Sequence, residues 1–171
     1  MAILFSTERL IVRKFTADDH TDLAEILTDP VVTYFEPYQT FTKEACVQEA
    51  INFSKSNEFF AVVFEEKVIG KIYFSDRKYG TFEIGYTFNR AYQGKGFASE
   101  SVKAMLHYAF EKLGVRRVIA EIDTRNEKSA NLARHIGMRL EATHIALFPS
   151  KEDESKYNDF YIYAILKDEL I

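Results

Sequence analysis

Cysteine is almost absent from this chain, and its histidines are few and scattered. The 171 residues include one cysteine, Cys46, which excludes an intramolecular disulfide. The four histidines show no metal-ligand spacing, so nothing in the sequence favours a metal site. We expect all four histidines to be structural or surface residues, and Cys46 to fill a small apolar space on a helix.

Long apolar runs and an excess of positive charge are also missing. No run approaches the roughly 18 apolar residues that cross a membrane, and the N-terminus lacks the apolar core of a secretory signal. The net charge is −4, whereas nucleic-acid-binding proteins usually carry a basic excess. We therefore expect a cytoplasmic protein that binds neither membranes nor nucleic acid directly. The negative charge mildly favours cationic substrates such as amines, although ordinary soluble proteins share it.

Repeats, low-complexity tracts and linkers are absent too, which predicts a single α/β domain over residues 1–171. The chain is 47% hydrophobic and 15% aromatic, as is typical of a folded globule. Within the second expected helix, residues 43–55, we expect the buried face to hold Ala45, Val47 or Ala50, and Ile51. The expected strands are residues 3–15, 59–65, 67–75, 81–88, 117–122, 139–148 and 158–166, and the helices follow Thr16, Thr42, Gly96 and Asn126.

The most informative stretch runs from Glu83 to Ser99. Its first half alternates, with Phe82, Ile84 and Tyr86 on one side, which predicts a strand with an aromatic face. A glycine-rich turn then opens a helix whose apolar residues recur at helical spacing. Because another strand follows this helix, the two strands are expected to be parallel.

A glycine-rich turn at the start of a helix can bind an anion. Glycines let the backbone approach a ligand, and the unpaired N–H groups of the first helical turn suit a phosphate or pyrophosphate. A P-loop would need Ser or Thr after Lys95, where Gly96 stands, so nucleotide hydrolysis is disfavoured. A dinucleotide fingerprint would need Gly or Ala at Ser99 and an earlier position in the fold, so it is a weak alternative. A connector without a ligand also stays open.

Three motifs in order resemble the GNAT superfamily of acetyl-CoA-dependent N-acetyltransferases. The turn Gln93-Gly-Lys-Gly-Phe-Ala98 fits the signature Gln/Arg-x-x-Gly-x-Gly/Ala. The segment Asn126-Glu-Lys-Ser129, followed by Ile136-Gly-Met138, looks like the family's next motif. The opening, Thr7-Glu-Arg-Leu-Ile-Val-Arg13, is similar to that of the ribosomal-protein N-terminal (alanine or serine) acetyltransferase branch. The resemblance spans nearly the whole chain.

This resemblance implies that the bound anion is the pyrophosphate of coenzyme A. It also implies that the pantetheine arm pairs like an extra strand with the end of the central strand. For Asn126 a plain helix N-cap is the alternative role, and for Arg134 a solvent-exposed arginine. The residues expected to contact acetyl-CoA are Tyr86, Thr87, Phe88, Gln93, Gly94, Lys95, Gly96, Phe97, Ala98, Ser99, Asn126, Ser129 and Arg134.

Glu83 is the carboxylate that we expect to act as the catalytic base. The acceptor amine must be neutral when it attacks, so a base must take its proton directly or through water. The resemblance places such a base on this strand. The alternative is that Glu83 is a cross-strand partner of Lys71 or Arg77. A backbone amide near Tyr86 or Thr87 would hold the developing oxyanion.

The proton donor for the departing thiolate stays open. Many relatives have a tyrosine seven residues after the Asn of the second motif, where this chain has Ala133. Ser129, Asn131, Tyr157 and Tyr161 are alternative donors, and unassisted departure is another.

The resemblance implies a mixed, mostly antiparallel sheet of about seven strands that splays after the fourth, flanked by about four helices, with acetyl-CoA in the opening. We expect the acceptor to be a protein or peptide N-terminus, and the chain to be a monomer or homodimer. A small amine, such as a polyamine, an aminoglycoside or an amino acid, is one alternative. A non-catalytic CoA-binding module is another. The helices between Asp18 and Lys55 and the loop from Pro149 to Tyr157 are expected to set substrate choice.

Overall fold

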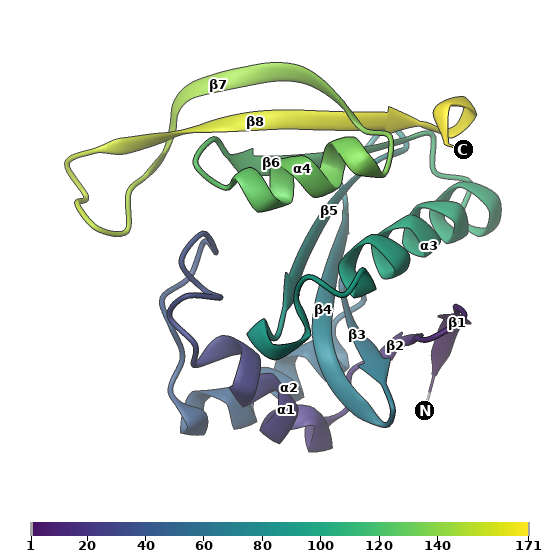
Figure 1. Cartoon of the computed structure of the whole chain (residues 1–171), viewed down its shortest axis with the longest axis vertical. Helices are drawn as coiled ribbons and strands as arrows, with labels where there is room; N and C mark the ends of the chain where they lie inside the picture. Colours follow the sequence, from purple (N-terminus) through teal and green to yellow (C-terminus); the bar gives the residue numbers. More distant parts are fainter. Residues whose placement is uncertain (1, 171) are drawn as a thin grey trace. The chain divides into compact units, whose positions relative to one another are not determined.

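The computed structural model describes residues 2–170, so the outermost residues of the predicted domain, Met1 and Ile171, lie outside the described residues. The described chain has eight strands and four α-helices, with three short 3₁₀-helices (Figure 1). In chain order the elements are β1 (Ile3–Ser6), β2 (Ile11–Lys14), η1 (Ala17–Asp19), α1 (His20–Leu27), α2 (Lys43–Lys55), β3 (Phe59–Phe64), β4 (Lys67–Asp76), β5 (Thr81–Phe88), η2 (Arg90–Tyr92), α3 (Phe97–Lys112), β6 (Arg117–Asp123), α4 (Glu127–His135), β7 (Arg139–Pro149), β8 (Tyr157–Leu166) and η3 (Lys167–Glu169).

Hydrogen bonds join the strands in the order β1-β2-β3-β4-β5-β6-β8-β7. The β5–β6 pair is parallel, whereas β1–β2, β2–β3, β3–β4, β6–β8 and β7–β8 are antiparallel. The predicted mixed, mostly antiparallel sheet with four α-helices is therefore confirmed. Among residues 2–170, no helix combines the length and the apolar character needed to cross a membrane.

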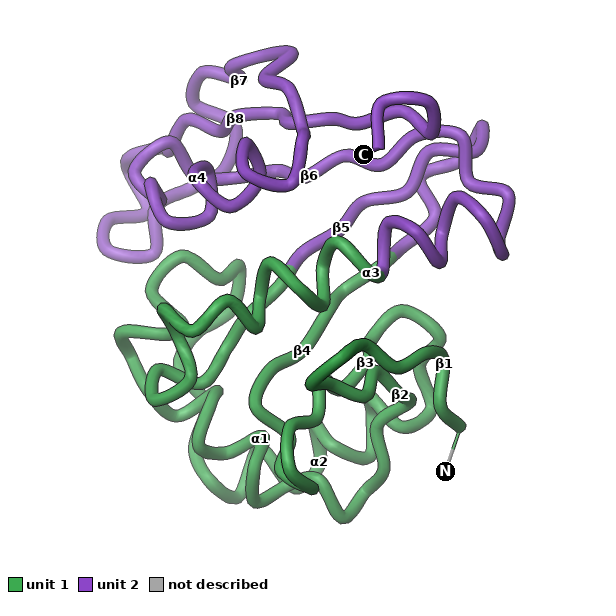
Figure 2. The backbone as a smooth tube through the Cα atoms, turned by 45° about the vertical axis from the view of Figure 1, so that its right-hand side comes forward, with its two compact units in different colours: residues 1–74, 86–104 green, residues 75–85, 105–171 purple. Residues whose placement is uncertain are grey.

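The chain forms two compact units (Figure 2). The first unit holds the chain up to Phe74 together with Tyr86–Ala104. The second unit holds Ser75–Gly85 and the chain from Met105 onward. The backbone passes from one unit to the other inside β4, β5 and α3, so each unit is assembled from two separate stretches of sequence.

Helices α1 and α2 supply much of the core of the first unit. On α1 the apolar residues Leu23, Ile26 and Leu27 are fully buried. On α2 the prediction of the buried face was wrong in part. Ala50 is buried, but Ala45 and Val47 are exposed. The other buried residues of α2 are Cys46 and Phe53, and Ile51 is only half-buried.

The α2 face is set by the ring of Phe53. This ring stacks on Phe59 of β3 at 4.2 Å and lies 5.2 Å from Phe15, so Cys46 and Ala50 follow it inward at helical spacing. Small apolar residues occur on more than one side of α2, and the sequence pattern could not choose between those sides. Cys46 is the expected small buried residue, since it is a free cysteine with no exposed surface.

The strand expected at residues 3–15 is two strands, which raises the number from seven to eight. A turn separates β1 from β2, and the two strands pair antiparallel. In this turn Thr7 N donates to Leu10 O at 2.8 Å, and Leu10 N donates to Thr7 Oγ1 at 3.0 Å. The β-branched Thr7 is typical of a strand, so the sequence pattern did not indicate a turn at this position. In the structure its hydroxyl satisfies the backbone of the turn.

The second unit is built on the start of β5 with β6, β8 and β7. Thr81–Glu83 pair in parallel with Arg117–Ile119, as the strand–helix–strand pattern predicts. Strand β8 pairs antiparallel with both β6 and β7, and α4 lies beside β6 and β7. The parting of β5 from β6 beyond Glu83 stays a prediction.

Candidate active site

The glycine-rich loop of the first unit has the backbone shape of an anion site. Gly94 and Gly96 have φ angles of +74° and +81°, in the region that favours glycine. A Cβ built on Gly94 meets no atom within 4 Å. The hydrogen bond from Glu100 N to Gly96 O, 3.0 Å long, starts α3, so by helix geometry the amides just before it have no acceptor within the helix. Open backbone amides and free space at the loop fit a phosphate group.

Two residues expected to contact the coenzyme use their side chains within the protein. Gln93 Nε2 donates to Phe88 O at 3.0 Å and ties the loop to the end of β5. The ring of Phe97 is buried and lies 4.7 Å from the ring of Phe64. Phe97 therefore has its backbone amide, rather than its ring, to offer a ligand.

A partly buried polar cluster holds the end of β5. Thr87 Oγ1 donates to Glu36 Oε1 at 2.6 Å, and Lys71 Nζ lies 3.6 Å from Glu36 Oε2. Lys71 Nζ also lies 5.3 Å from the centre of the Tyr38 ring. Burial raises the pKa of the Tyr38 phenol, and the negative charge of Glu36 raises it further.

The sequence analysis missed Glu36 and Tyr38, because they lie in an irregular segment between two helices. Lys71 was considered only as a partner for Glu83, and in the structure it pairs with Glu36. A signal was nevertheless present, since a lysine between Gly70 and Ile72 interrupts an apolar strand. A fully buried lysine usually needs a carboxylate nearby.

In the second unit, Glu83 pairs with an arginine. Arg77 Nε donates to Glu83 Oε2 at 2.6 Å, and a second guanidinium nitrogen of Arg77 contacts the same oxygen. The Glu83 side chain is 13% exposed. The cross-strand partner that the sequence offered as an alternative is therefore present, and a role as base stays a prediction.

Glu121 of β6 is a second carboxylate near Glu83 that the sequence analysis missed. Glu83 pairs with Ile119, and Glu121 lies two residues further along β6, so both carboxylates belong to the same face of the strand pair. Burial raises the pKa of Glu121 and the charge of Glu83 raises it further, while Arg77 and His144 act in the opposite direction. The period-two pattern of residues 117–122, combined with parallel pairing, could have placed Glu121 on the same face as Glu83.

Helix α4 of the second unit carries the remaining predicted contacts. Asn126 caps the helix, because its side-chain oxygen accepts from Ser129 N at 3.2 Å. Arg134 is exposed on this helix and donates to Tyr163 Oη at 2.6 Å. Ala133, at the position where many relatives have tyrosine, is fully buried.

A hollow of about 300 Å³ lies beside α4. It brings Arg134 together with Asn131 and Tyr161, two of the alternative proton donors; the other lining residues are Thr124, Glu127 and Ala130. Within residues 2–170, no three His, Cys, Asp or Glu side chains are grouped as a metal site requires.

Comparison with known proteins gives a consistent result. A family model described as "Acetyltransferase (GNAT) domain" matches residues 9–139. The chain is 35% identical over 172 residues to the uncharacterized N-acetyltransferase YnaD of Bacillus subtilis, covering 96% of this chain and 97% of that protein. It is 27% identical over 113 residues to the ribosomal-protein-serine acetyltransferase of Escherichia coli, covering 65% of this chain and 62% of that protein. A crystal structure of a GNAT-family acetyltransferase from Bacillus anthracis superposes with a TM-score of 0.90 at 32% identity, covering 99% of this chain and 100% of that one.

Proposed function

Because the chain belongs to the GNAT family of acetyl-CoA-dependent N-acetyltransferases, we propose that it transfers an acetyl group to the amine of a protein or peptide N-terminus. The observation that carries the choice of acceptor is the match to a ribosomal-protein-serine acetyltransferase over 113 residues. The negative net charge agrees with a cationic acceptor. One catalytic domain and a cytoplasmic location belong to the same proposal.

We assign the pyrophosphate of acetyl-CoA to the glycine-rich loop. The amides of Gly96, Phe97 and Ala98 would donate to its oxygens, with Gln93, Gly94, Lys95 and Ser99 around them. The backbone of Tyr86, Thr87 and Phe88 would pair with the pantetheine arm. Asn126, Ser129 and Arg134 keep their predicted role as coenzyme contacts.

For the chemistry, we propose that the carboxylates of Glu83 and Glu121 provide the base. The amine nitrogen would form a bond to the thioester carbonyl carbon and give up its proton to a carboxylate. The carbon–sulfur bond would break with its electron pair on sulfur, so that coenzyme A leaves as the thiolate. A base works best when its pKa lies near the working pH. Of the two carboxylates, Glu121 has a pKa that is raised by burial and by the charge of Glu83. Glu121 is a candidate proton acceptor for this reason, and Glu83 is a candidate because the family resemblance places a base on its strand.

An acceptor panel tests this proposal through the release of coenzyme A thiol from acetyl-CoA. The panel contains peptides that begin with alanine or serine, the same peptides with blocked N-termini, and small amines such as spermidine, an aminoglycoside and free amino acids. We expect turnover with the free N-termini and none with the blocked peptides.

Two other results would contradict the proposal, and each would support a different function. Turnover confined to the small amines would assign the enzyme to metabolites. Binding of acetyl-CoA by calorimetry, with no thiol released for any acceptor, would support the non-catalytic module.

A further inference from the structure

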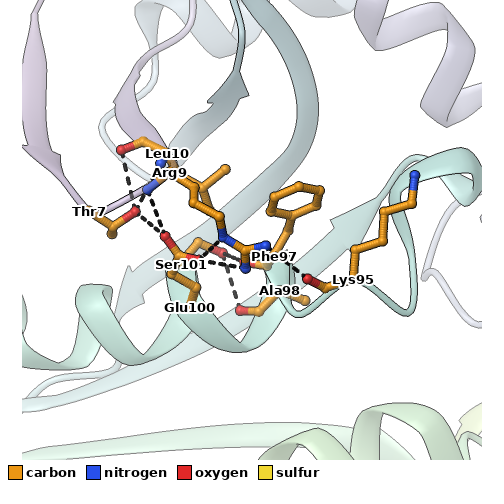
Figure 3. A network of polar contacts seen from close by, with 8 residues as sticks. All are labelled: Thr7, Arg9, Leu10, Lys95, Phe97, Ala98, Glu100 and Ser101. Carbon is orange, nitrogen blue, oxygen red and sulfur yellow. Dashed lines mark hydrogen bonds and ion pairs between the residues drawn. The ribbon is translucent and has the colours of Figure 1, made fainter.

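The segment that opens the chain is attached to the start of α3 (Figure 3). Arg9 Nε donates to Glu100 Oε2 at 2.7 Å, and a terminal nitrogen of its guanidinium lies 2.7 Å from the same oxygen. The other Glu100 oxygen accepts from Thr7 Oγ1 at 2.5 Å and from Arg9 N at 3.1 Å. All these residues lie in the first unit.

The negative charge of Glu100 is unexpected beside a site for phosphate. It lies in the first turn of α3, two residues after the last of the amides that we assign to the pyrophosphate. A carboxylate there is favourable toward the helix dipole, but it repels a phosphate that binds at the same helix end. Burial favours the neutral acid, yet hydrogen bonds from Thr7 and Arg9 hold the pKa of Glu100 below its ordinary value. The carboxylate is therefore charged at neutral pH, and its charge must be compensated.

Arg9 also contacts the glycine-rich loop itself. One terminal nitrogen donates to Lys95 O at 3.1 Å, and the guanidinium carbon lies 4.4 Å from the centre of the Phe97 ring. A Cβ built on Gly96 would lie 3.3 Å from the other terminal nitrogen. Arg9 therefore joins three parts of the loop and helix start: the Lys95 carbonyl, the Phe97 ring and the Glu100 carboxylate.

We propose that Arg9 is a positioning residue for the phosphates of acetyl-CoA. It neutralises Glu100 at the anion-binding end of α3 and fixes the Lys95 carbonyl, so that the loop amides stay directed toward the ligand. Thr7 completes this arrangement by holding the second carboxylate oxygen. The inference rests on the proposed assignment of the pyrophosphate to this loop.

The test compares two acetyl donors, acetyl-CoA and S-acetylpantetheine, which carry the same thioester with and without phosphates. For Arg9→Gln we expect kcat/KM with acetyl-CoA to fall about tenfold, mainly through KM, because an uncompensated carboxylate repels the phosphates. With S-acetylpantetheine we expect no change. Lys112→Gln, at the exposed C-terminal end of α3, is the matched control for the loss of one positive charge and is expected to behave as the wild type.

A double variant separates charge compensation from simple structural support. Glu100→Gln in the Arg9→Gln background removes the carboxylate that Arg9 neutralises, and we expect it to restore most of the affinity for acetyl-CoA. Arg9→Lys keeps the charge without the planar fork and is expected to lie between the wild type and Arg9→Gln. Calorimetric titration with coenzyme A and thermal unfolding accompany each variant.

Equal losses with both donors, or no recovery in the double variant, would assign Arg9 a purely structural role and overturn the inference. Wild-type-like binding of coenzyme A by Arg9→Gln would overturn it as well, and would leave the proposed function intact. Failure of the wild-type protein itself to bind coenzyme A would instead refute the cofactor assignment, and the inference with it.

Discussion

Glu83 and Glu121, two carboxylates on one face of the β5–β6 pair, both interact with the positive charge of Arg77. Glu83 is held by Arg77, and Glu121 has a pKa raised first by burial and then by Glu83. A carboxylate whose negative neighbour is removed becomes a stronger acid. Variants at the two positions should therefore have different effects on the pH profile of acetyl transfer.

If Glu121 accepts the proton, Glu121→Gln should reduce kcat by about two orders of magnitude or more. Glu83→Gln should then keep most of the activity but move the acidic limb of the kcat/KM profile to lower pH, because the pKa of Glu121 falls. Steady-state rates measured from pH 5 to 9 check both. Loss of activity in Glu83→Gln together with an unchanged Glu121→Gln would assign the base to Glu83, as the sequence predicts.

Asp19 is the acceptor in a buried ion pair, and its removal should be costly. Arg13 donates to both Asp19 oxygens, at 2.7 and 2.8 Å, and the two residues are 5% and 8% exposed. Breaking such a pair leaves a buried charge without compensation. Asp19→Asn should therefore lower the free energy of unfolding by about 3–5 kcal/mol in urea titrations. Asp18→Asn, at the exposed neighbouring position, is the control and should change it by less than about 0.5 kcal/mol.

At the scale of elements, the end of β5 lies directly on β4. A Cβ built on Gly70 would lie 2.5 Å from Cδ1 of Phe88, so Gly70 is required by the ring above it. Asn89 N donates to Ile69 O at 2.9 Å and continues this contact beyond β5. The strand end that carries Thr87 and the proposed pantetheine contacts therefore depends on a glycine in the neighbouring strand.

Gly70→Ala should destabilise the protein by about 1–3 kcal/mol, because the added methyl group forces Phe88 to move. It should also raise KM for acetyl-CoA, since Phe88 lies at the end of the predicted pantetheine strand. Denaturant unfolding and steady-state kinetics measure the two effects. Phe88→Leu in the Gly70→Ala background shortens the ring contact and should recover part of the stability, whereas an unchanged loss would point to a backbone cause.

Elements with strong local signals could be predicted from the sequence. Thr42 caps α2 and Asn126 caps α4 through their own side chains, and Glu65 and Glu66 form the turn of the β3–β4 hairpin with positive φ angles. Features set by distant partners could not be predicted. The buried face of α2 depends on Phe59, which the helix pattern does not contain.

The candidate site likewise contains features that the sequence could predict and features that it could not. The glycine-rich loop is a local motif and could be found from the sequence, because glycine at positive φ and a helix start are encoded by neighbouring residues. The contact of Arg9 with Lys95 and Glu100 joins residues about ninety positions apart, and Thr87 with Glu36 joins residues 51 apart. Periodicity carries no information on such pairs, so both remained hidden.

For the whole molecule, the carboxylates with lowered pKa predict sensitivity to acid. Hydrogen bonds from Arg117, and then from Arg139, lower the pKa of Glu141 from 4.5 to about 2. A carboxylate of lowered pKa stabilises the folded state above its unfolded pKa and loses this contribution as the pH falls through the folded value. Stability should therefore decline from about pH 4.5 to about pH 2.

Glu141→Gln should make this decline shallower, because it removes one of the groups that take up protons on unfolding. Thermal unfolding between pH 2 and 7 measures the slope for the wild type and the variant. Glu154→Gln, in the loop that follows β7, is the control with the same loss of charge and should follow the wild-type slope. Identical slopes for Glu141→Gln and the wild type would exclude Glu141 as a contributor.

The passage of the chain between the two units within β4, β5 and α3 has a consequence for synthesis on the ribosome. The first unit is incomplete until Tyr86–Ala104 have emerged, and by then Ser75–Gly85 of the second unit have already been made. The second unit waits longer still, because β6 pairs with β8, which ends at Leu166. Each unit can therefore finish folding only after its second stretch of sequence has been translated. Until then its strands have unpaired edges, and we expect chaperones to act on these edges.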